Sequence, residues 1–281
     1  MSKPYAEVIG DPIAQSKSPV IHGYWLGKLG IAADYGRAHV VPHDLPDYIA
    51  NRRDDPAWLG CNVTMPHKQA IIPLLDRLHP VAARIGAVNT VVREDDGSLT
   101  GRNTDAPGFL EPLLPVLADE GAPQDALVIG AGGAARAIVV ALADAGFTIT
   151  LAARDPAKAR SLLDELAPAK GNSTMAIADL ARAGYGAFGL VVNASPLGMK
   201  GNPPLDFHFG QAGEAAILYD IVTSPLVTPL IEQARERGLR TVDGLTMLIG
   251  QAAEAFEHFY GMAAPRGDGD VELRALLLGG A

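Results

Sequence analysis

The sequence lacks the features that mark several other classes of protein. Cysteine occurs once among the 281 residues, at Cys61, which rules out a disulfide within the chain. Lysine and arginine form no basic run, and the formal charge of −9 argues against nucleic acid as a partner, because phosphate backbones require clustered cations. The seven histidines show no zinc-like spacing beside cysteine, so we expect no metal site.

Long apolar runs are also missing, because the longest apolar stretch is interrupted by Arg136 and Asp144. A membrane-spanning helix needs about 20 apolar residues in succession, so none is expected. The first residues, Met1-Ser2-Lys3-Pro4, form no apolar leader, and with the single cysteine they indicate the cytoplasm. A hydrophobic content of 48% lets the chain form two packed domains of ordinary size, which fits a soluble enzyme.

The segment 62–68, NVTMPHK, is the first that indicates chemistry. It places Lys68 just after Pro66, and proline favours the first turn of a helix. Helix amides make that end partly positive, so an ammonium group is electrostatically misplaced there. Lysine can act as an acid or a base near neutrality when its surroundings disfavour charge. Lys68 is therefore either a catalytic residue or an ordinary lysine on a solvated helix face.

Two further segments contribute polar side chains that could join such a site. Asp105 closes the run 101–105, GRNTD, shortly before Pro107, and Asn89 lies in the segment 86–90, GAVNT, at the end of an apolar stretch. Each has an ordinary alternative. Asp105 could cap a helix that starts near Pro107, and Asn89 could be a turn residue.

A strand, a glycine-rich turn and a helix follow one another between residues 126 and 145. Residues 126–129, ALVI, are typical of a buried strand, and residues 130–135, GAGGAA, open an apolar helix. Gly130 permits the tight turn, Gly132 lets the backbone approach a pyrophosphate, and Ala135 lets the helix pack close to the sheet. Helix N-terminal amides bind phosphates, and a second strand follows at 147–151. We therefore predict a dinucleotide site rather than a plain turn.

The residues after that second strand bear on which dinucleotide binds. NAD sites usually place Asp or Glu there to bind the ribose hydroxyls, whereas this chain has Arg154, with Lys158 four residues later. The planar guanidinium suits a 2′-phosphate, so NADP is favoured. Asp155 could orient Arg154, bind the ribose directly, or form a surface pair of little energetic value.

The rest of the chain alternates predicted strands and helices, as a parallel α/β fold requires. Residues 90–93 and 99–100 are expected to form a hairpin across residues 95–97. A helix at 246–260 should end at Gly261 and pack on the first domain. The other expected strands are 6–10, 38–41, 60–63, 174–178, 190–193, 217–221 and 240–242, and the other expected helices are 19–29, 46–51 and 271–278.

Taken in order, several short segments of the sequence resemble those of the shikimate dehydrogenase family, and together they span nearly the whole chain. The matching segments are GDPI at 10–13, SKSP at 16–19 with His22, residues 62–68, 86–90, 103–105 and 130–135, NASPLGM at 193–199, and residues 243–251 from DGL to Gln251.

The resemblance implies an α/β fold with an open α/β substrate-binding catalytic domain, residues 1–105 and 243–281, and a doubly wound Rossmann NADP-binding domain, residues 106–242. It also implies reversible reduction of 3-dehydroshikimate to shikimate with NADPH, in aromatic amino acid (chorismate) biosynthesis. Lys68 and Asp105 would be the catalytic pair. Substrate would contact Ser16, Ser18, Thr64, Asn89, Thr223 and Gln251, and the cofactor would contact Gly130, Ala131, Gly132, Gly133, Ala134, Arg154, Lys158, Asn193, Ile221 and Gly244.

Some positions depart from the family pattern. Thr223 stands where a substrate-binding tyrosine is usual, Gln15 replaces a common histidine, and residues 153–155, ARD, replace Asn-Arg-Thr. A quinate or quinate/shikimate dehydrogenase that uses NAD is therefore an alternative function. An inactive nucleotide-binding regulatory module is an alternative of another class, and the chain could be a monomer or a homodimer.

Overall fold

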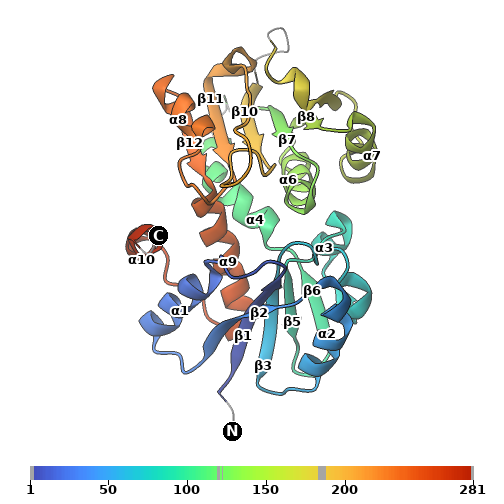
Figure 1. The fold of residues 1–281 in the computed structure, drawn as a ribbon, viewed down its shortest axis with the longest axis vertical. Helices are drawn as coiled ribbons and strands as arrows, with labels where there is room; N and C mark the ends of the chain where they lie inside the picture. The colour runs from blue at the N-terminus through green and yellow to red at the C-terminus, as the bar shows by residue number, and fades with distance from the viewer. Residues whose placement is uncertain (1–2, 119–120, 122, 183–187, 280–281) are drawn as a thin grey trace. The chain divides into compact units, whose positions relative to one another are not determined.

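The computed structural model describes residues 3–118, 121, 123–182 and 188–279, which form two compact units. The first unit combines both ends of the chain, residues 1–104 and 249–281, and the second comprises residues 105–248. Met1 and Ser2, on which the expectation about a leader partly depends, lie outside the described residues. Each unit is built around one six-stranded sheet (Figure 1).

The first unit alternates strands and helices along the N-terminal part of the chain and ends with two helices. Its strands are β1 (Tyr5–Gly10), β2 (Asp34–His39), β3 (Trp58–Val63), β4 (Arg77–Leu78), β5 (Thr90–Arg93) and β6 (Leu99–Arg102). Its helices are α1 (Ser18–Leu29), α2 (Leu45–Arg53), α3 (Pro80–Ile85), most of α9 (Gly244–Tyr260) and α10 (Asp268–Gly279), with single 3₁₀ turns η1 (Pro42–Asp44) and η2 (Ile72–Leu74).

The sheet of the first unit has the order β2-β1-β3-β5-β6-β4 and is mixed rather than parallel. β1 pairs with β2 and β3 in parallel, whereas β5 runs antiparallel to both β3 and β6. The predicted hairpin is thus confirmed, and it introduces the antiparallel pairs into a sheet in which β1, β2 and β3 are parallel. A direct hairpin turn can only join antiparallel strands.

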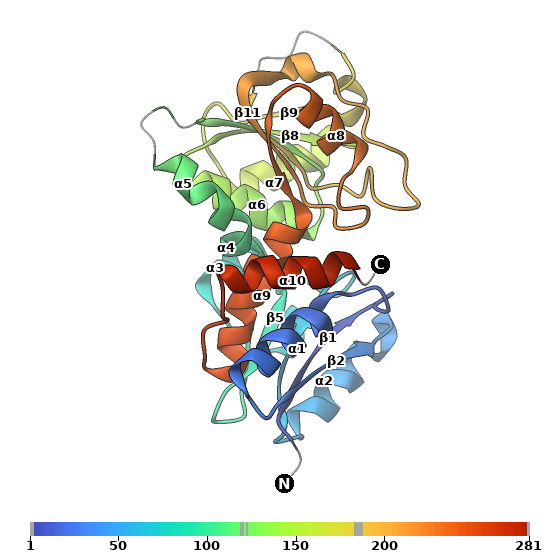
Figure 2. The same ribbon diagram turned by 90° about the vertical axis from the view of Figure 1, so that its left-hand side faces the viewer.

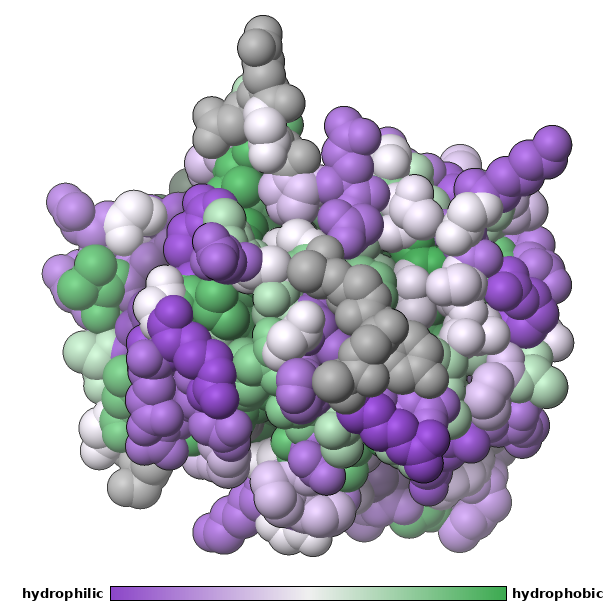
Figure 3. Space-filling model, turned by 90° about the horizontal axis from the view of Figure 1, so that it is seen from above, coloured by the Kyte–Doolittle hydropathy of each residue, from purple (hydrophilic) through white to green (hydrophobic). Residues whose placement is uncertain are grey.

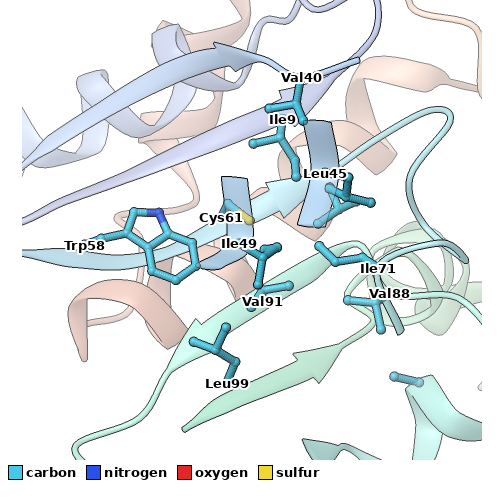
Figure 4. Close-up of a cluster of buried hydrophobic side chains, with 12 residues drawn as sticks. Ile9, Val40, Leu45, Ile49, Trp58, Cys61, Ile71, Val88, Val91 and Leu99 are labelled. Carbon is cyan, nitrogen blue, oxygen red and sulfur yellow. The ribbon is translucent and has the colours of Figure 1, made fainter. Parts of the chain in front are cut away.

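Side chains on the two faces of this sheet enter two separate hydrophobic clusters. Val91 packs with Leu45 and Ile49 of α2 on one face, in the cluster drawn in Figure 4. The next residue, Val92, packs with Ala255 and Phe259 of α9 on the other face. Successive strand residues point to opposite faces, so this alternation places α2 and α9 on opposite sides of the sheet. The prediction that residues 246–260 pack on the first domain is confirmed from Ile249 onward.

The second unit contains six further strands and five helices, if the described residues alone are counted. Its strands are β7 (Asp125–Ile129), β8 (Thr148–Ala153), β9 (Ser173–Ala176), β10 (Phe188–Asn193), β11 (Ala212–Asp220) and β12 (Arg240–Asp243). Its helices are α4 (Asp105–Leu110), α5 (Leu114–Leu117), α6 (Gly133–Asp144), α7 (Pro156–Leu166) and α8 (Pro229–Glu236), with 3₁₀ turns η3 (Glu111–Leu113), η4 (Ile177–Asp179) and η5 (Phe209–Gln211) and the first turn of α9.

All pairings in the sheet of the second unit are parallel, in the order β12-β11-β10-β7-β8-β9. Read from β9, this is the strand order 3-2-1-4-5-6 of the doubly wound dinucleotide-binding fold. The predicted Rossmann fold is therefore confirmed. The strand order reverses between β7 and β10, and ligands of such sheets bind at the carboxyl ends of the strands beside that point.

Helix and strand positions agree with the sequence patterns to within a few residues, and the larger differences have physical reasons. Helix α1 ends at Leu29 with Gly30 in the left-handed conformation, as the pattern predicts. No α-helix forms around Lys68, where the described residues 65–70 make hydrogen-bonded turns. Pro73 follows closely after Pro66 and disfavours helical geometry in the residue before it, so the expected helix is wrong.

The surface shown in Figure 3 is mostly hydrophilic (purple) or intermediate (white), and its hydrophobic atoms (green) lie in separate small areas. In the part of the chain that the structure describes, no helix combines the length and the apolar character that a membrane crossing requires. Figure 2 shows α10 beside α1, and Lys17 Nζ donates a hydrogen bond to Leu277 O at 3.0 Å, which connects α10 to the start of α1.

Candidate active site

Ser16 and Ser18 lie together at the start of α1. Their Oγ atoms are 3.3 Å apart, and Ser18 N–H donates to Ser16 Oγ at 3.4 Å. Arg37 of β2 fixes the loop, because its Nε and Nη2 donate to Ser16 O at 3.1 and 2.6 Å. Lys17 holds the N-cap position of α1, and Ser18 is the first helical residue. Its hydroxyl therefore faces Ser16 rather than the helix amides.

The Lys68 segment is anchored from both sides. The buried His67 side chain donates from Nε2 to Val40 O at 2.6 Å, and Val88 N–H donates to Lys68 O at 2.7 Å. Thr64 begins the turn, since its carbonyl accepts from His67 N–H at 3.0 Å. Lys68 is half-buried. Its backbone is thus fixed by neighbouring strands and turns, without the helix dipole that the sequence pattern suggests.

Asn89 and Gln251 come together although they are 162 residues apart in the chain. Asn89 Nδ2 donates to Thr104 Oγ1 at 2.9 Å and to Gln251 Oε1 at 3.4 Å. Asn89 Oδ1 accepts from Thr104 N–H at 2.8 Å and from the Thr90 hydroxyl at 3.1 Å. Both ends of the Asn89 amide are therefore oriented. Thr90 and Thr104 have no role in the sequence-based site, although both lie in its segments.

Asp105 is 6% exposed and directly follows Thr104. It is the first residue of α4 and of the second unit, whereas Lys68 belongs to the first unit. The catalytic pairing of these two side chains stays a prediction.

The glycine-rich turn after β7 has the geometry that a dinucleotide site requires. Gly130 has a φ of 113°, and a Cβ atom there would lie 2.8 Å from Ala194 O, so a side chain is excluded by conformation and by space. A Cβ atom on Gly132, by contrast, would meet nothing within 4 Å. Gly132 is exposed at the N-cap of α6, where no side chain caps the helix. The first amides of α6 are thus accessible to an anion, and the turn fits a pyrophosphate.

Arg154 and Lys158 are exposed at the end of β8 and in the first turn of α7. Asp155, between them, is the N-cap of α7: its Oδ1 accepts from Ala157 N–H at 3.0 Å and from Lys158 N–H at 3.3 Å. The carboxylate is therefore engaged by the helix, which weakens the alternative that it binds a ribose. The two cations match the 2′-phosphate of NADP, and the residues present fit this cofactor.

Asn193 is completely buried at the end of β10, and its side-chain hydrogen bonds go to the protein. Its Oδ1 accepts from Ser195 N–H at 3.1 Å and from the Ser195 hydroxyl at 2.7 Å. Its Nδ2 donates to Leu197 O and to Asp220 Oδ1, each at 3.0 Å. A cofactor contact of Asn193 would therefore come from its backbone, while its side chain shapes the loop after β10.

Asp220 holds the loop that carries Ile221 and Thr223. This buried carboxylate at the end of β11 accepts from Val222 N–H at 3.1 Å and from the Thr228 hydroxyl at 2.6 Å, besides Asn193. Burial raises the pKa of Asp220, and its hydrogen bonds oppose that increase. Sequence reasoning missed Asp220 and Thr228, although an acidic residue that ends an apolar strand is a usable signal.

Gly244 begins α9 against the same loop, and we expect its replacement by alanine to destabilise the second unit. A Cβ atom there would lie 2.3 Å from Ile221 O and 2.5 Å from Val222 O, and these backbone atoms cannot yield easily. Overpacking of this kind typically costs about 1–3 kcal/mol. Thermal unfolding of Gly244→Ala should show a lower Tm. The control is Gly238→Ala: a Cβ atom there would meet nothing within 4 Å, although Gly238 has a φ of 74°, and this variant should lose less stability. Equal losses would contradict the steric argument.

The described residues contain no group of three or more His, Cys, Asp or Glu side chains that could hold a metal ion.

Two family models match the chain. One, the shikimate dehydrogenase substrate binding domain, covers residues 8–91, and the other, the shikimate 5'-dehydrogenase C-terminal domain, covers residues 244–268. The chain is 54% identical to shikimate dehydrogenase (NADP(+)) of Sphingopyxis alaskensis, over 99% of this chain and 98% of that one. It is 46% identical to the same-named enzyme of Methylobacterium radiotolerans, over 98% and 96%.

A solved structure agrees with these sequence matches. Shikimate 5-dehydrogenase of Thermus thermophilus, in complex with NADP(H) and shikimate, is 34% identical and superimposes with a TM-score of 0.82. The match covers 98% of this chain and 99% of that one. With both sequence and fold matched from end to end, the chain belongs to the shikimate dehydrogenase family.

Proposed function

We propose that the protein is an NADP-dependent shikimate dehydrogenase that interconverts 3-dehydroshikimate and shikimate in aromatic amino acid biosynthesis. The observation that carries this most directly is end-to-end identity of 46–54% with relatives named for that activity and cofactor. We assign substrate binding to a site that includes Ser16, Ser18, Asn89 and Gln251, and cofactor binding to the glycine turn after β7; together they would supply what the reaction needs. We also place the enzyme in the cytoplasm.

The cofactor site is assigned to the second unit. The pyrophosphate would lie at the N-terminus of α6, over Gly130, Ala131, Gly132, Gly133 and Ala134. Arg154 and Lys158 would hold the 2′-phosphate, because a guanidinium can bind two phosphate oxygens and stack on adenine. Ile221 and Gly244, whose backbones approach closely, would border the nicotinamide end with Asn193. NADPH, when bound, supplies the hydride for the ketone carbon.

Lys68 is assigned as the general acid. As the ketone is reduced, negative charge grows on its oxygen, and a lysine ammonium beside that oxygen stabilises the charge and gives up a proton. Asp105, as a neighbouring carboxylate, would hold the ammonium in place, and the proton that Lys68 gives up would be replaced from solvent. In the reverse direction Lys68 removes the proton of the shikimate hydroxyl.

Substrate recognition is assigned to Ser16, Ser18, Thr64, Asn89 and Gln251, with Thr223 as a further contact. A small ring that bears a carboxylate and several hydroxyls needs short polar side chains with fixed donors and acceptors. Asn89 and Gln251 provide these, since their amides are already oriented by Thr104 and Thr90. Thr223 has a much shorter side chain than the usual tyrosine, which leaves room for a water molecule or a bulkier ring such as quinate.

Four assays in one preparation test the proposal. Initial rates are measured for shikimate and for quinate, each with NADP and with NAD. Shikimate with NADP should give the highest kcat/KM. A higher value for quinate with NAD would establish the alternative dehydrogenase, and cofactor binding without turnover of either acid would establish the regulatory module.

Arg154→Ala should raise the KM for NADP by about 10- to 100-fold, as expected for the loss of one charged hydrogen-bonded contact. The KM for NAD should change little, because NAD has no 2′-phosphate. Arg160→Ala is the matched control: Arg160 lies on α7, the helix that follows Arg154, and its Nη1 donates to Asn172 O at 3.2 Å. An equal rise of both KM values would show a general disturbance of the site instead.

A further inference from the structure

We infer that Tyr35 is a positioning residue for shikimate, which orients the substrate-binding amides through Asn62 and Thr90. The inference rests on the proposed function, because shikimate is the ligand that these amides would bind. Tyr35 lies on β2 and is separated in sequence from every substrate-binding segment.

The Tyr35 ring is held in one orientation. It stacks on the imidazole of His22, with ring centroids 3.9 Å apart and an angle of 5° between the planes. His22 is completely buried on α1, so neither ring can turn freely. The phenol hydroxyl donates to Asn62 Oδ1 at 2.5 Å. A rigid donor is thus directed at one end of the Asn62 amide.

This donor and the Asn89 carbonyl, which can only accept, together fix which way the Asn62 amide points. An asparagine amide has a donor end and an acceptor end of nearly the same shape, so its orientation depends on its partners. With the phenol at Oδ1, Nδ2 faces β5 and donates to Thr90 Oγ1 at 3.0 Å and to Asn89 O at 3.3 Å. Asn62 is buried, and an incorrect orientation would leave polar atoms unpaired.

The orientation passes along the chain of hydrogen bonds to Asn89. Because Thr90 Oγ1 accepts from Asn62, its own hydrogen is available for Asn89 Oδ1, at 3.1 Å. Asn89 Nδ2 then faces Gln251 Oε1 at 3.4 Å. The direction of donation is therefore uniform from Asn62 to Gln251, and substrate hydroxyls would meet a defined set of donors and acceptors.

The Tyr35 phenol stays protonated. Burial raises the pKa of Tyr35 well above its usual value, so the hydroxyl remains a donor to Asn62 at working pH.

Tyr35→Phe tests the inference, because it keeps the ring stack on His22 and removes only the hydroxyl. We expect the Kd for shikimate, measured by titration calorimetry without cofactor, to rise by about tenfold, the scale of one buried hydrogen bond. The KM for shikimate should rise in parallel, while the KM for NADP stays near that of the unmodified enzyme. Thr90→Val removes the next hydroxyl in the series of hydrogen bonds and should give the same pattern. It replaces Tyr35→Phe as the test if that variant does not fold.

Tyr48→Phe is the matched control, since Tyr48 also loses a phenol hydrogen bond, to Glu7 Oε1 at 2.8 Å, outside this network. It should lower stability to a similar degree and leave the Kd for shikimate unchanged. If the Tyr35 and Thr90 variants bind shikimate as Tyr48→Phe does, Tyr35 is merely structural and the inference is overturned. Failure of the unmodified protein to bind or turn over shikimate would instead overturn the proposed function.

Discussion

Lys68→Ala is expected to lower kcat for shikimate oxidation by about 10²-fold or more, the usual scale for the loss of a general acid or base. The backbone of Lys68 is held by Val88 and by the anchored His67 side chain, so the turn should survive the substitution. The KM for NADP should change little. Gln69→Ala, at the exposed neighbouring position, is the control for local disturbance. Near-normal turnover of Lys68→Ala would remove Lys68 from the role of general acid.

The proposed partnership with Asp105 makes a second part of this prediction. Asp105→Asn should also lower kcat, and the double variant Lys68→Ala/Asp105→Asn should be little worse than the more damaged single variant. Residues that act as one unit show such non-additive effects. If the two decreases multiply instead, Lys68 and Asp105 act independently, and the catalytic pair is wrong even though each residue matters.

His22→Phe is expected to make the first unit much less sensitive to acid. Burial lowers the pKa of His22 from 6.5 to about 3, and neither of its ring nitrogens has a hydrogen-bond partner among the described residues. Between these pKa values the unfolded chain binds a proton at His22 that the folded protein excludes. Folding stability therefore falls as the pH decreases from 6.5 toward 3, by about 4 to 5 kcal/mol in total from this one group.

Phenylalanine keeps the stack on Tyr35 and the contacts with Trp25 and Phe256, but it binds no proton. Between pH 7.5 and pH 5, the free energy of unfolding should decrease by about 2 kcal/mol less in the variant than in the unmodified protein. Urea unfolding followed by tryptophan fluorescence measures this in the first unit, because both tryptophans of the chain, Trp25 and Trp58, lie there. Parallel pH profiles of the two proteins would contradict the prediction.

Other groups in the first unit also titrate in this range. Because they are present in both proteins, comparing His22→Phe with the unmodified protein at each pH removes their contribution to the pH dependence of stability. Burial raises the pKa of Glu254 to about 7, so protonation of Glu254 favours the folded state as the pH falls, opposite in sign to His22. His43→Phe is a suitable control, because the His43 side chain is 82% exposed. This variant should leave the acid dependence unchanged.

Local patterns predicted the fold well where neighbouring residues in sequence decide the structure. Helix α1 with Gly30, the glycine turn after β7 and the long helix ending at Gly261 all follow from periodicity and from terminal residues. β4 has two residues and no periodic pattern, and it exists only because β6 lies beside it. The helix expected at Lys68 failed because two prolines flank a short segment, a local conflict that is visible in the sequence.

The candidate site was predictable as a set of segments but not as a network. Sequence reasoning gave Asn89 and Gln251, and the structure joins them through Thr104 and Thr90. Such hydrogen bonds depend on the register of β3, β5 and β6, which no local pattern specifies. Tyr35 illustrates the limit, since an isolated tyrosine in an exposed-looking strand gives no sign of a buried partner.

The position of Asp155 makes it harder to change the coenzyme preference of the enzyme from NADP to NAD. Removal of Arg154 would weaken affinity for NADP, but the adjacent carboxylate is already committed to two amides of α7. Redirecting it to an adenosine ribose would uncap the helix, at a cost of about 1 kcal/mol. With the proposed role of Arg154, coenzyme reversal in this scaffold would require an additional acidic residue, because the Asp155 carboxylate stabilises α7.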